Sequence, residues 1–107
     1  MAATAQFSYR IVPVRPPMLV SGPTEHEMQV MTVHFAHLQK LAAAGVVLMA
    51  GRTVDTGADT WGIVVFRAAS PAEAVVRSDP AIAQGLMRRQ LFPCRVAVWS
   101  DQFRPGA

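Results

Sequence analysis

The sequence predicts an α+β domain in which an antiparallel sheet carries two helices on one face, in the ferredoxin-like order β-α-β-β-α-β. Three observations support this class. Residues 7–14 alternate apolar and polar side chains, as a half-buried strand requires. Residues 24–44 carry the helical period between two cap signals. Residues 46–50 and 61–67 are short apolar runs rich in β-branched side chains, as buried strands are.

The first strand is expected over residues 7–14. Its apolar side chains would point toward one face of the sheet, namely Phe7, Tyr9 and Ile11. Pro13 cannot donate a hydrogen bond to a neighbouring strand, so it marks the strand's end or an edge position. Residues 16–23 then contain three prolines and form a connection that is longer than most. Two roles are open for this connection, an active-site lid or simple packing.

A long amphipathic helix is expected from Thr24 to about residue 44. Thr24 and Glu27 have the spacing of a capping box, in which the hydroxyl accepts from a free backbone N–H and the carboxylate reaches back. Gly45 suits the left-handed position that ends a helix. Apolar side chains recur at alternating steps of three and four and predict one buried stripe of Met28, Met31, Phe35, Leu38 and Ala42.

The three histidines belong to this helix. At about 100° per residue, His34 falls beside the apolar stripe, at the border between core and solvent. His37 lies further round and should be more exposed, and His26 lies in the first turn.

Two strands follow the helix, at residues 46–50 and 61–67. The intervening residues 53–60 are rich in turn formers and indicate a hairpin-like connection. Both strands are apolar on both faces, so one side should meet the helices and the other something else.

A second, short helix should open at Ser70, with Ser70 as N-cap, Pro71 as first helical residue and Glu73 completing a capping box. Residues 78–80 should break it, because the residue before a proline avoids the α region. The last strand is expected over residues 91–99, with Cys94 on one of its two apolar faces.

The connection rules turn this order into one ferredoxin-like domain over residues 1–107, with its core at about 7–99. Such a sheet leaves one face bare, whereas its central strands are apolar on both faces. A second copy of the chain would cover that face most simply. The sequence therefore predicts a homodimer in which two sheets form a dimeric α/β barrel.

The amino-acid composition limits which classes of protein this chain can belong to. The chain has 107 residues, of which 51% are hydrophobic and 16% charged, so it is a folded protein of one domain. The net charge of +3 comes from scattered arginines, which predicts no nucleic-acid binding but a modest attraction for anionic small molecules. The single cysteine, Cys94, excludes an intrachain disulfide and fits a reducing compartment. With no long apolar run or signal-peptide pattern, we expect a cytoplasmic protein that does not bind membranes.

The run from His34 through Gly45 to Gly51 resembles the signature of the YCII-related (YciI-like) family, a histidine, a glycine and an Ala-Gly pair at this spacing. Residues 70–74 and 79–85 are similar to its Ser-x-x-Glu-Ala and Asp-Pro-x-x-x-x-Gly segments. The resemblance covers roughly residues 7–99. It implies the fold of muconolactone isomerases and small antibiotic-biosynthesis monooxygenases. One relative is a dehydrochlorinase that acts on a chlorinated hydroquinone.

This resemblance implies that His34 and Asp79 form an active-site pair. The chemistry is coherent from the residues alone. Histidine exchanges protons near neutral pH. An aspartate bonded to one ring nitrogen fixes the tautomer and raises the basicity of the other nitrogen. The structural alternatives are that Asp79 merely breaks and caps a helix, and that His34 merely packs.

The chain departs from the family at two places. Arg52 stands where the family usually has a proline, and an arginine that often precedes the family's histidine is missing from residues 31–33. Arg52 is a candidate anchor for an anionic substrate, or else a solvated arginine at a strand end. Trp61 and Tyr9 are candidates for lining an aromatic-accepting pocket, with core packing as the alternative.

We expect no metal and no cofactor. His34 and His37 have a spacing that can hold a metal, but no third ligand is positioned to complete such a site. The sequence also lacks a phosphate-binding glycine loop and a dinucleotide fingerprint.

The expected function is cofactor-free proton transfer, in which His34 is the general acid/base and Asp79 orients it. The reaction would be an isomerisation, an elimination such as dehydrochlorination, or a hydrolysis of a small molecule, with aromatic compounds among the candidates. The alternative is a non-catalytic dimer that binds a small molecule or regulates a partner. A cofactor-free monooxygenase follows only from the shared fold.

Overall fold

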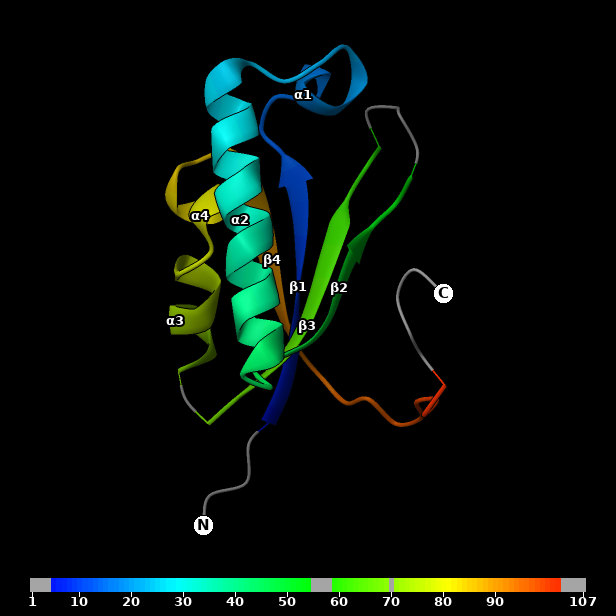
Figure 1. Ribbon diagram of the computed structural model, residues 1–107. Coiled ribbons are helices and arrows are strands. Elements are labelled where there is room, and N and C mark those ends of the chain that lie inside the picture. Colours follow the sequence, from blue (N-terminus) through cyan, green and yellow to red (C-terminus); the bar gives the residue numbers. More distant parts are fainter. Residues whose placement is uncertain (1–4, 55–58, 70, 103–107) are drawn as a thin grey trace.

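An antiparallel four-stranded sheet of order β2-β3-β1-β4 forms the base of the fold (Figure 1). The computed structural model describes residues 5–54, 59–69 and 71–102. Its strands are β1 (Ala5–Pro13), β2 (Val47–Arg52), β3 (Gly62–Ala68) and β4 (Met87–Cys94). The two central strands are β3 and β1, and every pairing is antiparallel. This is the ferredoxin-like arrangement that the sequence predicts.

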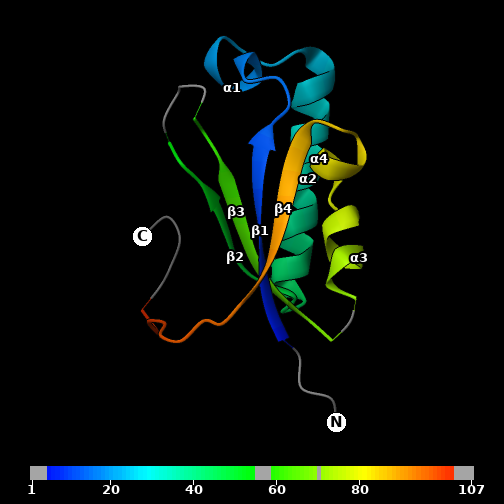
Figure 2. The ribbon, with the colours of Figure 1, turned by 180° about the vertical axis from the view of Figure 1, so that it is seen from behind.

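Four helices complete the order, namely α1 (Pro17–Val20), α2 (Glu25–Ala43), α3 (Ala72–Arg77) and α4 (Pro80–Ala83). Figures 1 and 2 show α2, α3 and α4 on one face of the sheet, with α1 near the end of β1. The connection at residues 16–23 therefore contains a short helix that the sequence did not predict. Met18 of this helix is buried in the core, so packing is one of its roles.

The capping box that opens α2 is confirmed. The Thr24 hydroxyl accepts from the Glu27 N–H at 3.1 Å, and Glu27 Oε1 accepts from the Thr24 N–H at 2.8 Å. Arg15 donates to both oxygens of Glu27 and thereby joins the end of β1 to the start of α2. These hydrogen bonds from Arg15 and Thr24 lower the pKa of Glu27 to about 2. At the other end, Gly45 has φ +77°, the left-handed position that the sequence predicts.

The predicted apolar stripe of α2 is right for Leu38 and Met31, which pack in or against the core, and wrong for Met28 and Phe35. The residues that α2 buries are Glu27, Val30, His34 and Leu38. Met28 and Phe35, which the stripe placed in the core, are 56% and 63% exposed. His34 belongs to this buried face and is therefore more buried than the predicted position beside the stripe implies. His37 is half-buried and its Nε2 lies 3.2 Å from Ser78 Oγ, whereas His26 is exposed.

The second half of the chain follows the prediction with two shifts. The second helix breaks at Asp79-Pro80 as expected, but it starts at Ala72 with Pro71 as N-cap. The predicted cap Ser70 lies outside the described residues, as do residues 55–58 of the connection between β2 and β3. The last strand is Met87–Cys94 and not residues 91–99. Because β4 is an edge strand, its polar residues can face solvent, and the apolar residues beyond it leave the sheet.

The hydrophobic core lies between the sheet and the helices. It is built from Tyr9, Ile11, Met18, Leu38, Val47, Val64, Phe66, Val76, Ala81 and Met87. The opposite face of the sheet carries Ile63 and Val65, which are half-buried, and the more exposed Met49 and Phe92. No helix within the described residues is long and apolar enough to cross a membrane.

Candidate active site

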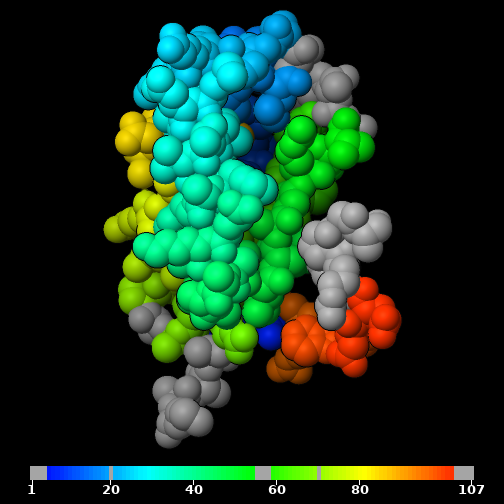
Figure 3. Space-filling model, in the orientation of Figure 1, coloured from blue at the N-terminus to red at the C-terminus, as the bar shows by residue number. Residues whose placement is uncertain are grey.

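A cleft of about 1210 Å³ opens between α2 and the strands β2 and β3. Figure 3 shows it as a hollow between the cyan helix and the green strands, with blue N-terminal residues at its depth. Its wall is mainly apolar and includes Met18, Leu19, Met28, Met31, Phe35, Val47, Trp61 and Ile63. The two exposed side chains of α2 that the sequence assigned to the core, Met28 and Phe35, therefore face this cleft. A β-carbon at Gly62 would lie 3.0 Å from Ile11 Cγ1, so glycine keeps the floor of the cleft compact.

His34 lies in the wall of the cleft and is only 7% exposed. On its other side is Asp79, and the distance from His34 Nδ1 to Asp79 Oδ1 is 2.6 Å. The two residues are 45 positions apart in the chain. α2 supplies the histidine from its buried face, and the break between α3 and α4 supplies the aspartate. The fold thus brings together the two residues that the sequence singled out.

Asp79 is fully buried and accepts hydrogen bonds from three donors. Its Oδ1 accepts from the Ala81 N–H at 2.9 Å as well as from His34, and its Oδ2 accepts from the Tyr9 hydroxyl at 2.7 Å. The bond from Ala81 makes Asp79 the N-cap of α4. Both roles considered for Asp79 therefore hold at once, since it caps a helix and contacts the histidine.

The environment of Asp79 favours its charged form. Burial raises the pKa of this carboxyl, but the hydrogen bond and charge of His34, together with the bonds from Tyr9 and Ala81, outweigh burial and lower the pKa below its ordinary value. Burial also raises the pKa of the Tyr9 hydroxyl well above its ordinary value, and the neighbouring carboxylate raises it further. Tyr9 therefore remains a proton donor to an ionised Asp79.

The remaining ring nitrogen of His34, Nε2, is the atom left for chemistry. Nδ1 lies against a carboxylate that can only accept, so in the neutral ring Nδ1 carries the proton and Nε2 carries the lone pair. Within the described residues, Nε2 has no hydrogen-bond partner. Every fully buried side-chain nitrogen or oxygen among these residues does have a partner, so Nε2 is not one of the fully buried atoms. We infer that Nε2 is accessible, and the cleft is the opening that His34 lines.

Of the other predicted site residues, Arg52 and Trp61 line the cleft and Tyr9 does not. Tyr9 is 1% exposed and lies beneath the cleft, where it contacts Asp79 rather than any ligand. Trp61 also stacks against Arg10, whose guanidinium carbon lies 5.2 Å from the ring centroid. Sequence reasoning missed the Tyr9–Asp79 bond. The inward alternation of β1 was a signal that Tyr9 is buried, but nothing local could identify a partner 70 positions away.

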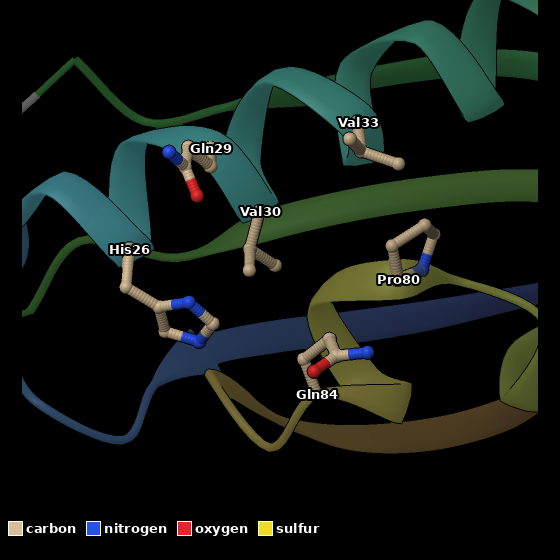
Figure 4. Close-up of a pocket in the computed structure, with 6 residues that line it drawn as sticks. All are labelled: His26, Gln29, Val30, Val33, Pro80 and Gln84. Atoms are coloured by element: carbon tan, nitrogen blue, oxygen red, sulfur yellow. The ribbon is translucent and has the colours of Figure 1, made fainter.

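A smaller pocket of about 270 Å³ lies between α2 and α4 (Figure 4). α2 contributes His26, Gln29, Val30 and Val33, and the α4 side contributes Pro80 and Gln84. No carboxylate lines this pocket, so His26 has no orienting partner there. Among residues 5–54, 59–69 and 71–102, no group of three His, Cys, Asp or Glu side chains is placed to hold a metal ion.

Comparison with known proteins bears on the same residues. The YCII-related domain matches residues 10–95, a span that includes His34, Asp79 and the cleft wall from both β2 and β3. A search of curated proteins found no match. The match covers most of the chain, so this protein belongs to the YCII-related domain family.

Proposed function

We propose that the cleft is the active site of a cofactor-free acid–base enzyme, in which His34 Nε2 exchanges a proton with a small molecule. The 2.6 Å contact between His34 Nδ1 and the buried Asp79 carboxylate carries this proposal. Asp79 holds the ring in the tautomer that leaves Nε2 free, and its negative charge stabilises the imidazolium that forms when Nε2 accepts a proton.

The proton transfer fits two reaction classes directly. In an isomerisation, Nε2 removes a proton from carbon, the electron pair shifts along the substrate, and the imidazolium returns the proton to a different atom. In an elimination such as dehydrochlorination, the pair released from the C–H bond forms a double bond while the leaving group departs with its own pair. In a hydrolysis, Nε2 would instead take the proton of an attacking water. The mainly apolar wall of the cleft favours a small apolar or aromatic substrate.

A non-catalytic binding or regulatory protein is the second candidate. A mostly apolar cleft of about 1210 Å³ would also suit a protein that only holds a small molecule. The buried Asp79 favours the enzyme, because a binding pocket has no need of an ionised carboxylate behind a histidine. We also propose that the protein works in the cytoplasm, where its one cysteine, Cys94, would stay a free thiol.

The orientation of His34 is the most direct test. In the neutral ring, ¹⁵N NMR should show a protonated Nδ1 and an unprotonated Nε2 in the wild type. In Asp79→Asn, the amide can face His34 with either its oxygen or its NH₂, so the ring should become a mixture of tautomers or reverse. An unchanged tautomer in Asp79→Ala, which offers the ring no oxygen at all, would mean that Asp79 does not orient it. His37→Gln serves as the control and removes the neighbouring resonance without touching Asp79.

We further propose that the protein is a homodimer, formed through the sheet face that carries no helices. Val65 lies near the middle of this face, opposite Ser8 on one neighbouring strand and Met49 on the other. Its neighbours Ile63, Met49 and Phe92 would lose exposed apolar area against a second copy.

Replacing Val65 by arginine should therefore produce a folded monomer, because a desolvated charge at the centre of an apolar interface is strongly unfavourable. Sedimentation equilibrium gives the mass, and circular dichroism checks the fold. Ala83→Arg places the same charge on the exposed end of α4 and should leave a dimer. A monomeric wild type, or a dimeric Val65→Arg variant, would exclude this interface.

A further inference from the structure

The cleft has one permanent charge in its wall, which is Arg52. The other described lining residues are apolar or neutral, apart from His34, and none of them is an aspartate or glutamate. Asp79 lies behind His34 and contributes no surface to the cleft, since it is fully buried. The cleft therefore presents a positive potential to a ligand, in a wall that is otherwise apolar.

The Arg52 guanidinium is available for a ligand. Its hydrogen bond is a long one of 3.4 Å from Nη1 to its neighbour Thr53 O, and it is in no ion pair with a described residue. Other arginines are already engaged: Arg15 with Glu27, Arg77 and Arg89 with Glu73, Arg67 with Gly45 O, and Arg10 with Trp61. Within the described part of the chain, Arg52 is thus an exposed guanidinium whose five N–H donors meet one acceptor, at 3.4 Å.

The strand register sets how far Arg52 lies from Tyr9, whose hydroxyl bonds to the Asp79 carboxylate behind His34. A β-bulge between Val47 and Met49 shifts β2 so that Arg52 pairs with Gly62, which in turn pairs with Ile11. Tyr9, which contacts Asp79, lies two residues before Ile11 in β1, and its side chain points to the same face of the sheet. Two strand spacings across and two residues along place the Cα atoms of Arg52 and Tyr9 about 12 Å apart.

Methionines form much of the surface between these two points. Four of the six methionines of the chain, Met18, Met28, Met31 and Met87, line the cleft from the helix side of the sheet. Thioether side chains adapt their shape and make favourable contacts with aromatic rings. Trp61 also contributes to the lining, and its backbone carbonyl accepts from the N–H of Thr53, the neighbour of Arg52. This surface suits a planar apolar body more than a sugar or a peptide.

We propose that the ligand of this cleft is an aromatic carboxylic acid, whose carboxylate binds Arg52 while its ring lies on the methionines near His34. A guanidinium binds a carboxylate through two parallel hydrogen bonds. One guanidinium without a second cation matches a single negative charge and not a phosphate dianion. The inference deepens the proposed function by naming its substrate class, and it rests on that function only for the choice of cleft.

Calorimetry tests this assignment with 3-phenylpropanoate and its neutral analogue 3-phenylpropanamide as probes. The wild type should bind the acid more tightly than the amide, by up to about fivefold, as expected of an ion pair to an exposed guanidinium. Arg52→Gln should lose that difference by weakening the acid alone. Arg88→Gln removes an exposed arginine that does not line the cleft, and it should bind both probes as the wild type does.

Three results would overturn the assignment. They are equal affinity of the wild type for acid and amide, an unchanged preference in Arg52→Gln, and tighter binding of 2-phenylethylphosphonate than of the carboxylate. His34 is not altered in any of these variants. Failure of the anchor is therefore distinguishable from failure of the proposed function, which would show as normal acid binding without proton transfer.

Discussion

Asp79→Ala is expected to lower the free energy of unfolding by about 3–5 kcal/mol, because it removes a buried carboxylate that accepts three hydrogen bonds. The alanine leaves three donors without an acceptor, namely the Tyr9 hydroxyl, His34 Nδ1 and the Ala81 N–H. Each buried donor without a partner costs about 1–3 kcal/mol. The variant also loses the N-cap of α4 and opens a cavity beside α2.

Urea unfolding measures this loss, and two further variants interpret it. Asp79→Asn keeps the shape and can still accept from Ala81, so it should be less destabilised than Asp79→Ala. Asp101→Ala removes an exposed carboxylate and should change stability by no more than about 0.5 kcal/mol. A loss below about 1 kcal/mol in Asp79→Ala would mean that the buried network does not exist in solution.

The dependence of stability on pH gives an independent check with a definite sign. The pKa of Asp79 is lower in the folded state than in the unfolded state, so folding favours the ionised carboxylate over the protonated acid. Its contribution is fully present above the ordinary aspartate pKa of about 3.9 and is lost as the pH falls through the folded value. The stability difference between wild type and Asp79→Asn should therefore shrink as the pH falls below about 4.

The sequence predicted the elements whose signals are local. The capping box of Thr24 and Glu27, the left-handed Gly45 and the break at Asp79-Pro80 each depend on residues within one turn of each other, and all three are present in the structure. The strand order followed because few ways exist to connect such elements. The family match, over residues 10–95, spans all four strands in whole or in part.

The orientation of α2 could not be predicted in the same way. Its apolar side chains serve two surfaces, because Leu38 packs into the core whereas Met28 and Phe35 face the cleft. A periodicity argument averages these two directions and gives one stripe that lies between them. His34 consequently fell at the edge of the predicted stripe, although it belongs to the buried face.

Long-range contacts explain the other differences. The bond from Tyr9 to Asp79 joins residues 70 positions apart, so no local pattern could distinguish an inward tyrosine in the core from one that lines a ligand site. β4 begins four residues before its predicted start. The prediction missed these residues because Arg88 and Gln90 are polar and exposed, and so lack the apolar pattern of a buried strand. An edge strand needs little apolar sequence, and its position is set by pairing with β1.

His34→Gln is expected to reduce proton transfer in the cleft by about 10²–10⁴-fold, the usual contribution of a positioned general base. Phenylpyruvate is a suitable probe, because it has the aromatic ring and carboxylate inferred for the ligand and an acidic CH₂ next to its ketone. In D₂O, the wild type should accelerate the replacement of these protons by deuterium, which ¹H NMR follows directly. Glutamine keeps a polar group toward Asp79 but has no group that accepts a proton near neutral pH.

Two controls separate lost chemistry from lost binding. His37→Gln alters the neighbouring histidine, which contacts Ser78 outside the cleft wall, and should exchange phenylpyruvate at the wild-type rate. His34→Gln should still bind 3-phenylpropanoate, because Arg52 and the methionines are intact. Asp79→Asn should lower the rate and also change its pH profile, as expected of a residue that acts through His34 and not on the substrate.

The result also decides between the two candidate functions. If the wild type binds aromatic acids but accelerates exchange in no enolisable member of the series, the cleft holds a ligand without turning it over, and the protein is a binding or regulatory dimer. If His34→Gln exchanges as fast as the wild type, the base is another group and the buried pair is structural. Catalysis that depends on His34, with binding that depends on Arg52, would assign the two ends of one cleft to two separate tasks. That division follows from their positions, since His34 has an ionised carboxylate behind it and Arg52 has no acidic partner among the described residues.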